Sequence, residues 1–228
     1  MTSNFYQTLS LPSNPLLPSA IETLRNNKIK GREQGDPYYQ IAYYNCNEVL
    51  TEETLNVFDT LGVTPFYVVH FGSLNNHITQ TYLHTDLFWT EDRYQTVPFG
   101  INWNLTSGTT TFRWYDAGDI PEAWPPHKMA DFQGIHYGQR YSKSIEGCEE
   151  LGSLSIEQNT AYLLKTDIPH RVTYTCDEPL RYGVSVRFKL EDIPTWDQAL
   201  KVFEPLFLAP QPGLEPGTYG LTVRRSTD

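Results

Sequence analysis

The sequence is poor in cysteine, and it contains no long hydrophobic run. Three cysteines occur in 228 residues, at Cys46, Cys148 and Cys176, and no two of them form a Cys-x-x-Cys pair. Such sparse use of cysteine is typical of a reducing compartment, so we expect a cytoplasmic protein. No segment approaches the ~20 apolar residues of a membrane span, and residues 1–20 lack the basic start of a signal peptide. We therefore expect no membrane association.

Basic residues are also scarce. Lys and Arg number 17 against 27 Asp and Glu, which gives a formal net charge of −10. Because binding to a phosphate backbone needs a basic footprint, this charge disfavours nucleic acid as a partner. Aromatic residues are abundant, at 14% of the chain, and each ring can bury a large apolar area. The composition therefore indicates a folded protein and excludes a disordered one.

Many short segments with alternating or β-branched residues, separated by turns, predict a mainly β protein with flanking helices. We expect one domain over residues 1–228, with an N-terminal arm and helices over 1–62, a β core over 63–190 and a C-terminal helix and tail over 191–228. Composition and periodicity lead only as far as a sandwich or barrel. The expected strands lie at 38–46, 65–71, 80–87, 97–105, 109–115, 153–156, 161–165, 171–175 and 181–190. Thr51 and Thr195 are expected to cap helices.

The segment 118–150 is rich in proline and glycine and reads as irregular. Loops of this length are usually binding loops or lids, or else disordered. We therefore expect a lid over residues 124–150.

One pair of polar residues has a spacing that matters for chemistry. His84 and Asp86 are two apart in an expected strand, so they point to the same face and can reach one metal ion. A third ligand must come from a strand that is a neighbour in space. His170 is the best candidate, because a proline turn delivers it to the start of a strand. Two histidines and one carboxylate form the facial triad of non-haem Fe(II) oxygenases, which leaves coordination positions open.

A second polar group lies eleven residues after His170. Arg181 opens an expected strand in which Gly183, Ser185 and Arg187 share its face. A buried guanidinium needs a partner, and the arginine fork suits a carboxylate. A dicarboxylate ligand would satisfy this face.

These residues carry a resemblance to a known superfamily. A His-x-Asp pair, a distal histidine and a basic residue about eleven positions later resemble the 2-oxoglutarate-dependent Fe(II) dioxygenases, over roughly residues 64–190. The segments 100–105 and 111–115 are similar to small aspartyl/asparaginyl-hydroxylase-like members, as is the stretch leading into His170. Arg181 and Arg187 together resemble the arginine pair of the AlkB-like branch.

The resemblance implies a double-stranded β-helix, that is, a jelly roll or cupin-like fold. It implies that His84, Asp86 and His170 bind Fe(II) and are the catalytic residues. The reaction would consume O2, and ascorbate would serve as the reductant in vitro. Asp86 favours hydroxylation, because the halogenating branch replaces this carboxylate with a small residue. The substrate would be a small molecule or a peptide side chain. Arg181, Ser185, Arg187 and Asn102 would bind 2-oxoglutarate, and Trp89 and Trp103 would line the substrate pocket.

Two other classes of protein stay open. A non-redox cupin-like metalloenzyme, such as an isomerase, could use the same three ligands, but it would leave Arg181 and Arg187 without a dicarboxylate. A non-enzymatic, aromatic-rich β-sandwich that binds a ligand such as carbohydrate would predict that His84, Asp86 and His170 do not converge. Neither the substrate nor the oligomeric state follows from the sequence.

Overall fold

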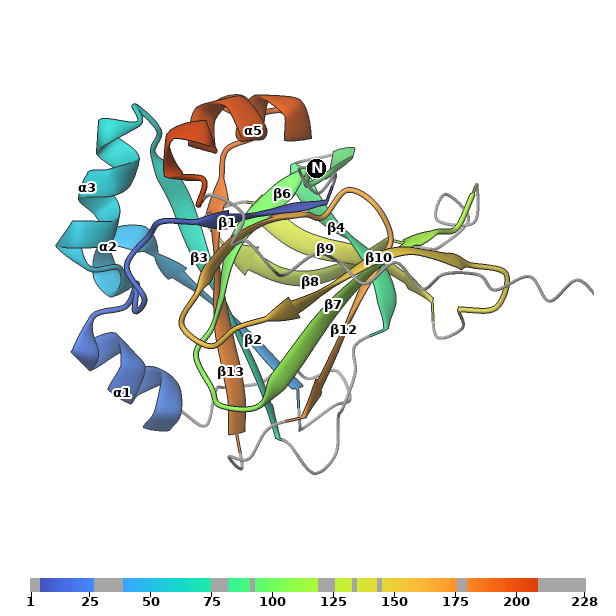
Figure 1. Cartoon of the computed structure of the whole chain (residues 1–228), viewed down its shortest axis with the longest axis horizontal. Coiled ribbons are helices and arrows are strands. Elements are labelled where there is room, and N and C mark those ends of the chain that lie inside the picture. Colours follow the sequence, from blue (N-terminus) through green and yellow to red (C-terminus); the bar gives the residue numbers. More distant parts are fainter. Residues whose placement is uncertain are drawn as a thin grey trace, which may run out of the picture.

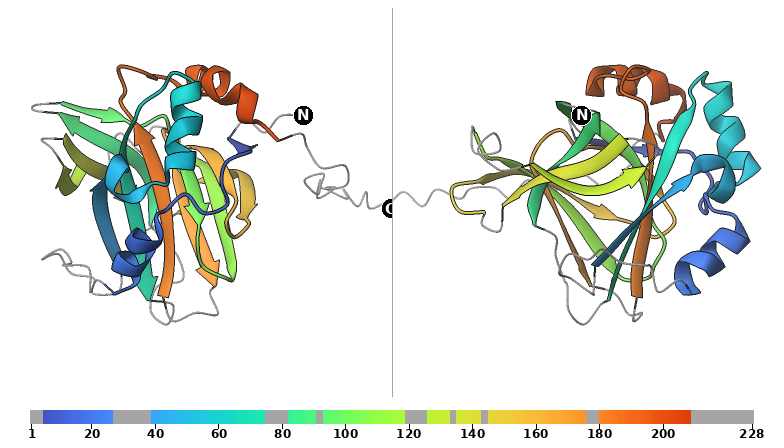
Figure 2. Two further views of the ribbon diagram at one scale, coloured as in Figure 1. Left: turned by 90° about the vertical axis from the view of Figure 1, so that its left-hand side faces the viewer. Right: turned by 180° about the vertical axis from the view of Figure 1, so that it is seen from behind.

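Two antiparallel β-sheets pack face to face, and helices cover the outer side of one of them (Figure 1). The computed structural model describes residues 5–26, 39–74, 82–90, 93–118, 126–132, 135–142, 145–175 and 180–208. In Figure 2 the left view looks onto the side that carries the helices, and the right view, from behind, shows the helices gathered on one side of the sheets.

The first sheet has six strands. Its strands, in spatial order, are β1 (Tyr6–Leu9), β11 (Ala161–Lys165), β6 (Phe99–Asn104), β13 (Leu180–Phe188), β3 (Pro65–Leu74) and β2 (Tyr39–Asn45). The strands of the second sheet, in spatial order, are β10 (Glu149–Ile156), β7 (Thr109–Asp116), β12 (His170–Thr175), β4 (Leu83–Thr90), β9 (Ile135–Ser142) and β8 (Pro126–Phe132), with β5 (Arg93–Thr96) paired to β4.

The order of the strands defines a double-stranded β-helix. Four pairs of consecutive strands, β3/β4, β6/β7, β10/β11 and β12/β13, each place one strand in each sheet. The central strands of the two sheets, β11-β6-β13-β3 and β10-β7-β12-β4, come from these pairs in the same order. This arrangement is the jelly roll, and the expected fold class is confirmed.

Four α-helices pack on the six-stranded sheet: α1 (Pro18–Asn26), α2 (Cys46–Val49), α3 (Glu52–Thr60) and α5 (Trp196–Phe203), which continues into the 3₁₀ turn η1 (Glu204–Leu206). Both expected caps are present, since Thr51 and Thr195 each accept a hydrogen bond from the backbone N–H three residues later. Gly62, at φ +70°, follows the end of α3 in the left-handed conformation that glycine tolerates best.

Strand β13 separates two environments. Val184 and Val186 face the helices and lie in the main apolar core. Ser185 and Arg187 alternate with them and face the space between the sheets, where both are buried. The inner face of the six-stranded sheet is therefore polar at this strand, as the sequence pattern predicts.

The expected irregular lid is wrong for most of residues 124–150. Strands β8 and β9 form a hairpin there, and β9 pairs along the whole of β4. Pro126 opens β8, at a position where the missing N–H is tolerated, and the register shifts between Lys128 and Ala130, opposite Gly138. The prolines and glycines mark a strand start and a bulge. Residues 119–125, 133–134 and 143–144 lie outside the described part.

The expected N-terminal arm is a strand over part of its length. Residues 6–9 form β1, which pairs with β11 at the edge of the six-stranded sheet. Part of the expected tail, residues 209–228, lies outside the described residues. Among the described helices, none combines the length and the apolar character needed to cross a bilayer.

Candidate metal centre

His84 and His170 stand opposite each other on neighbouring strands. They form the register pair of β4 and β12, and their ring centroids are 4.3 Å apart. Asp86 lies two residues beyond His84 on the same face of β4. All three side chains are buried, and each offers a ligand atom within 4.8 Å of the other two. The structure thus brings together the three residues that the sequence predicts as metal ligands.

Both imidazoles are fixed through the nitrogen that faces away from the site. Nδ1 of His84 donates to the carbonyl oxygen of Tyr82 at 2.7 Å, and Nδ1 of His170 donates to that of Ile168 at 2.9 Å. Because a carbonyl only accepts, the proton of each neutral ring lies on Nδ1. Nε2 therefore carries the lone pair that a metal ion needs, which is the usual arrangement around metal-binding histidines.

Burial keeps these rings neutral. It lowers the pKa of His84 below its usual value, against the opposing effect of Asp86. Burial, reinforced by neighbouring His84, lowers the pKa of His170 to about 3. Phe112 stacks on His170, with ring centroids 4.8 Å apart and planes 17° apart, and holds the ring from the apolar side. The two histidines are thus in the protonation state that binds metal.

The two carboxylate oxygens of Asp86 have different neighbours. Oδ1 lies 3.8 Å from Nε2 of His84. Bonds of about 2.1 Å from one ion to each atom can span this distance. Oδ2 accepts a hydrogen bond from Nη2 of Arg187 at 2.8 Å, in an ion pair whose two side chains are 3% and 1% exposed.

Arg187 was predicted to bind the cosubstrate, and its described contacts are with the protein. Besides Asp86, its Nη1 donates to the carbonyl oxygen of Phe99 at 3.3 Å and to Oγ1 of Thr166 at 3.5 Å. Thr166 was not predicted. Its own hydroxyl donates to the carbonyl of Val97, and its carbonyl accepts from the backbone N–H of Asp86. No pattern in the sequence indicates this role, because every partner is distant along the chain.

Ser185 and Asn102 form a second polar pair on the same inner face. The Ser185 hydroxyl donates to Oδ1 of Asn102 at 2.6 Å. Both were predicted as cosubstrate ligands, and the structure places them together beside Arg187. Gly100 makes room for this group, because a Cβ there would lie 2.7 Å from Oγ of Ser185 and 2.8 Å from Cζ of Arg187.

Trp103 was predicted to line a substrate pocket, and the structure places it elsewhere. It lies one residue from Asn102, on the opposite face of β6, in the core beneath the helices. Its indole N–H donates to the carbonyl of Pro12 at 3.0 Å. This position does not border the space between the sheets. The side chains of Trp89, on β4, and Arg181, on β13, lie outside the described residues.

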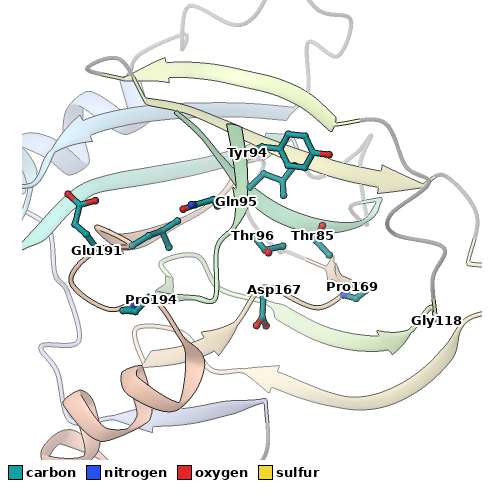
Figure 3. Close-up of a pocket in the computed structure, with 11 residues that line it drawn as sticks. Thr85, Tyr94, Gln95, Thr96, Gly118, Asp167, Pro169, Glu191 and Pro194 are labelled. Carbon is teal, nitrogen blue, oxygen red and sulfur yellow. The ribbon is translucent and has the colours of Figure 1, made fainter. Parts of the chain in front are cut away.

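A groove of about 860 Å³ runs along the other face of β4 (Figure 3). Thr85 and Leu87, which alternate with the two ligands of that strand, line it together with Asp167 and Glu191. Both carboxylates have lysine neighbours, since Asp167 lies 3.9 Å from the Nζ of Lys165 and Glu191 lies 4.0 Å from that of Lys189. None of the three candidate metal ligands lines this groove.

Comparisons with known proteins add little to this geometry. No family model matches the sequence, and no curated protein matches it. Among solved structures, similarity is found to the vicilin from Solanum melongena in two crystal structures. The first has a TM-score of 0.32 and 8% identity over 82% of this chain and 44% of the vicilin chain. The second has a TM-score of 0.31 and 9% identity over 79% and 42%.

This chain therefore spans less than half the length of the vicilin chains. Likeness at this level carries no argument about function. The class of protein rests on the strand order and the buried residues of this chain: it is a jelly-roll protein with a buried His-Asp-His group that can hold a metal ion.

Proposed function

We propose that the protein is an Fe(II)- and 2-oxoglutarate-dependent oxygenase that hydroxylates an unactivated C–H bond of a small molecule or an amino-acid side chain. The observation that supports this most directly is the convergence of His84, Asp86 and His170, with both imidazoles presenting Nε2. Two imidazole nitrogens and one carboxylate oxygen are the donor set that suits non-haem Fe(II) and leaves open positions on the ion.

The residues around the ligands fit the cosubstrate as well. The inner face beside the site carries the hydroxyl of Ser185 and the amide of Asn102, in a region where apolar side chains would otherwise fill the core. A keto acid needs such polar groups once it leaves water. The assignment of Arg181 to the distal carboxylate of 2-oxoglutarate remains a prediction from the sequence.

Bound iron would supply the activation of O2, in which one oxygen atom enters succinate and the other enters the substrate, while 2-oxoglutarate loses CO2. The protein would contribute geometry and exclusion of water. The Tyr82 and Ile168 carbonyls orient the two imidazoles, and Phe112 covers one side of His170. Burial of all three ligands keeps bulk water from the site.

The test is turnover of 2-oxoglutarate. Purified protein with Fe(II), ascorbate and 2-oxoglutarate should form succinate slowly even without substrate, and a metabolite or peptide screen should reveal compounds that accelerate it. His84→Ala and Asp86→Ala should abolish this turnover. Glu150→Gln, which changes an exposed carboxylate on β10, is the matched control and should retain it. Equal succinate from wild type and both ligand variants would refute the proposal.

A non-redox metalloenzyme of the same fold is the second candidate. The observation that favours it is the ion pair of Arg187 with Asp86, which engages one of the two arginines predicted to meet a dicarboxylate. In that case the protein would bind Mn(II) or Zn(II) at the triad, and 2-oxoglutarate would neither bind nor be consumed. Calorimetric titration of the metal-loaded protein with 2-oxoglutarate separates the two candidates.

A further inference from the structure

Arg187 is among the most deeply buried charged side chains in the described part of the protein. It is 1% exposed, and its hydrogen-bond partners include Asp86, Phe99 and Thr166. A guanidinium is seldom buried to this degree without a partner, and its shortest contact is with a candidate metal ligand. Its position therefore affects how that ligand can bind.

We propose that Arg187 is a positioning residue that reserves Oδ2 of Asp86, so that the carboxylate binds metal through Oδ1 alone. Oδ2 is 2.8 Å from Nη2 of Arg187, whereas Oδ1 lies 3.8 Å from Nε2 of His84. One oxygen is thus engaged by the guanidinium, and the other points toward the histidines. This inference rests on the metal-binding part of the proposed function.

Both partners of the ion pair are held in place. The backbone N–H of Asp86 donates to the carbonyl of Thr166 at 3.2 Å, and the Thr166 hydroxyl contacts Arg187. On the other side, the absence of a Cβ at Gly100 leaves the space that the end of the Arg187 side chain occupies. The carboxylate consequently cannot turn both oxygens toward an ion unless it leaves the guanidinium.

The number of oxygen atoms that Asp86 supplies determines how many coordination positions on a bound ion stay open. With one oxygen from Asp86, the protein supplies three donors and leaves three positions on a six-coordinate ion. With both oxygens it would supply four and leave two, which is too few for a bidentate cosubstrate and O2 together. Arg187 also offsets the charge of Asp86, so the carboxylate attracts a divalent ion less strongly than it would alone.

The experiment measures metal binding with Mn(II) and Co(II) alone. In Arg187→Met, the buried carboxylate loses the counter-charge of the guanidinium, and a bound divalent ion can replace that charge. We expect a lower melting temperature in EDTA, a larger rise on addition of Mn(II) than in wild type, and a dissociation constant for Mn(II) lowered by about tenfold. The visible absorption spectrum of the Co(II) form should change, because the carboxylate can then become bidentate.

Two further variants test the inference if Arg187→Met fails to fold. Arg187→Lys keeps the charge and should bind Mn(II) within about twofold of wild type, since a single charge suffices to offset Asp86. Gly100→Ala places a methyl group against the end of Arg187 and should shift Mn(II) affinity in the same direction as Arg187→Met, by a few-fold. Arg113→Met removes the partly exposed arginine that pairs with Glu150 at 3.5 Å, and this control should leave metal binding unchanged.

The outcomes separate this inference from the proposed function. If Arg187→Met loses the same stability with and without Mn(II) and its Co(II) spectrum equals that of wild type, Arg187 is purely structural and the inference fails. If Mn(II) binding is unchanged while only the affinity for 2-oxoglutarate falls, Arg187 is a cosubstrate ligand and the inference also fails. If the metal results are as expected but no succinate forms, the oxygenase proposal fails and the inference stands. Wild-type protein that binds no metal would overturn both.

Discussion

His84 and His170 are 86 positions apart in the sequence, and they form a cross-strand pair with ring centroids 4.3 Å apart. The antiparallel register of β4 and β12 creates this proximity, and Asp86 joins the pair because it lies two residues from His84 on the same face. The candidate metal centre therefore arises from the pairing of these two strands.

The first prediction concerns metal-dependent stabilisation. A ligand present at 100 times its dissociation constant stabilises the folded state by about 2.7 kcal/mol, which corresponds to a rise of about 5–10 °C in melting temperature for a chain of this size. Wild-type protein should show such a rise with saturating Mn(II), and His170→Ala should lose it. Differential scanning fluorimetry with Mn(II) or EDTA measures both. A full thermal shift in His170→Ala would mean that the metal binds elsewhere.

The second prediction concerns pH. The pKa of His170 is lowered to about 3 in the folded protein, and that of His84 is also lowered, whereas the unfolded chain has the usual value of 6.5. Below pH 6.5 the unfolded state binds more protons, so the free energy of unfolding of the metal-free protein should fall as the pH falls. This stability is fully present above the unfolded value and is lost toward pH 3.

The expected slope reaches about 1.4 kcal/mol per pH unit for His170, and His84 contributes in the same direction. Urea unfolding in EDTA at pH 7, 6 and 5 measures it. In His170→Asn the contribution of one histidine disappears, so the slope should be shallower. An identical slope in this variant would show that the pH dependence has another origin.

The sequence predicts that the three candidate metal ligands converge, because their signals are local. Period-two alternation places His84 and Asp86 on one face, and the turn at Pro169 places His170 at the start of its strand. The same alternation predicts that Ser185 and Arg187 share an inner face, and the structure confirms this. Strand existence follows from residue type and spacing, so most of the expected strands occur within a few residues of their predicted limits.

The sequence does not predict which side chains form hydrogen bonds and ion pairs with residues on other strands. Arg187 and Asp86 are 101 positions apart, and only the order of strands in both sheets brings them to 2.8 Å. The same limitation explains Thr166, whose partners also lie on other elements. For β8 and β9 the error was different. Proline and glycine predict a loop there, whereas Pro126 opens a strand and Gly138 lies opposite an irregularity in register.

A third prediction concerns the apolar support of the site. Phe112 is 3% exposed and stacks on His170, so Phe112→Ala should lower the free energy of unfolding by about 3–5 kcal/mol. It should also weaken Mn(II) binding, because His170 loses the surface that holds its ring. Phe112→Leu retains most of the volume and should cost far less. Chemical denaturation and Mn(II) titration test both effects, and unchanged metal affinity in Phe112→Ala would contradict the supporting role.

A fourth prediction concerns the polar pair beside the metal centre. If Ser185 binds the cosubstrate, Ser185→Ala should raise the KM for 2-oxoglutarate by about tenfold, which is the loss expected for one hydrogen bond to a charged group. The thermal shift with Mn(II) should not change. Ser155→Ala, at an exposed position on β10, is the control. An unaltered KM in Ser185→Ala would remove Ser185 from the cosubstrate site and leave it as the partner of Asn102.

The alternation of polar and apolar side chains along β13 also affects which strand register the chain adopts during folding. A slip of one residue against β3 or β6 would push Arg187 into the apolar layer beneath the helices and turn Val186 toward the two histidines. Such a misregistered intermediate would lose the ion pair with Asp86 and bury an uncompensated cation at the same time. The ion pair of Arg187 with Asp86 thus disfavours incorrect strand pairing during folding, and only the correct register completes the candidate metal centre.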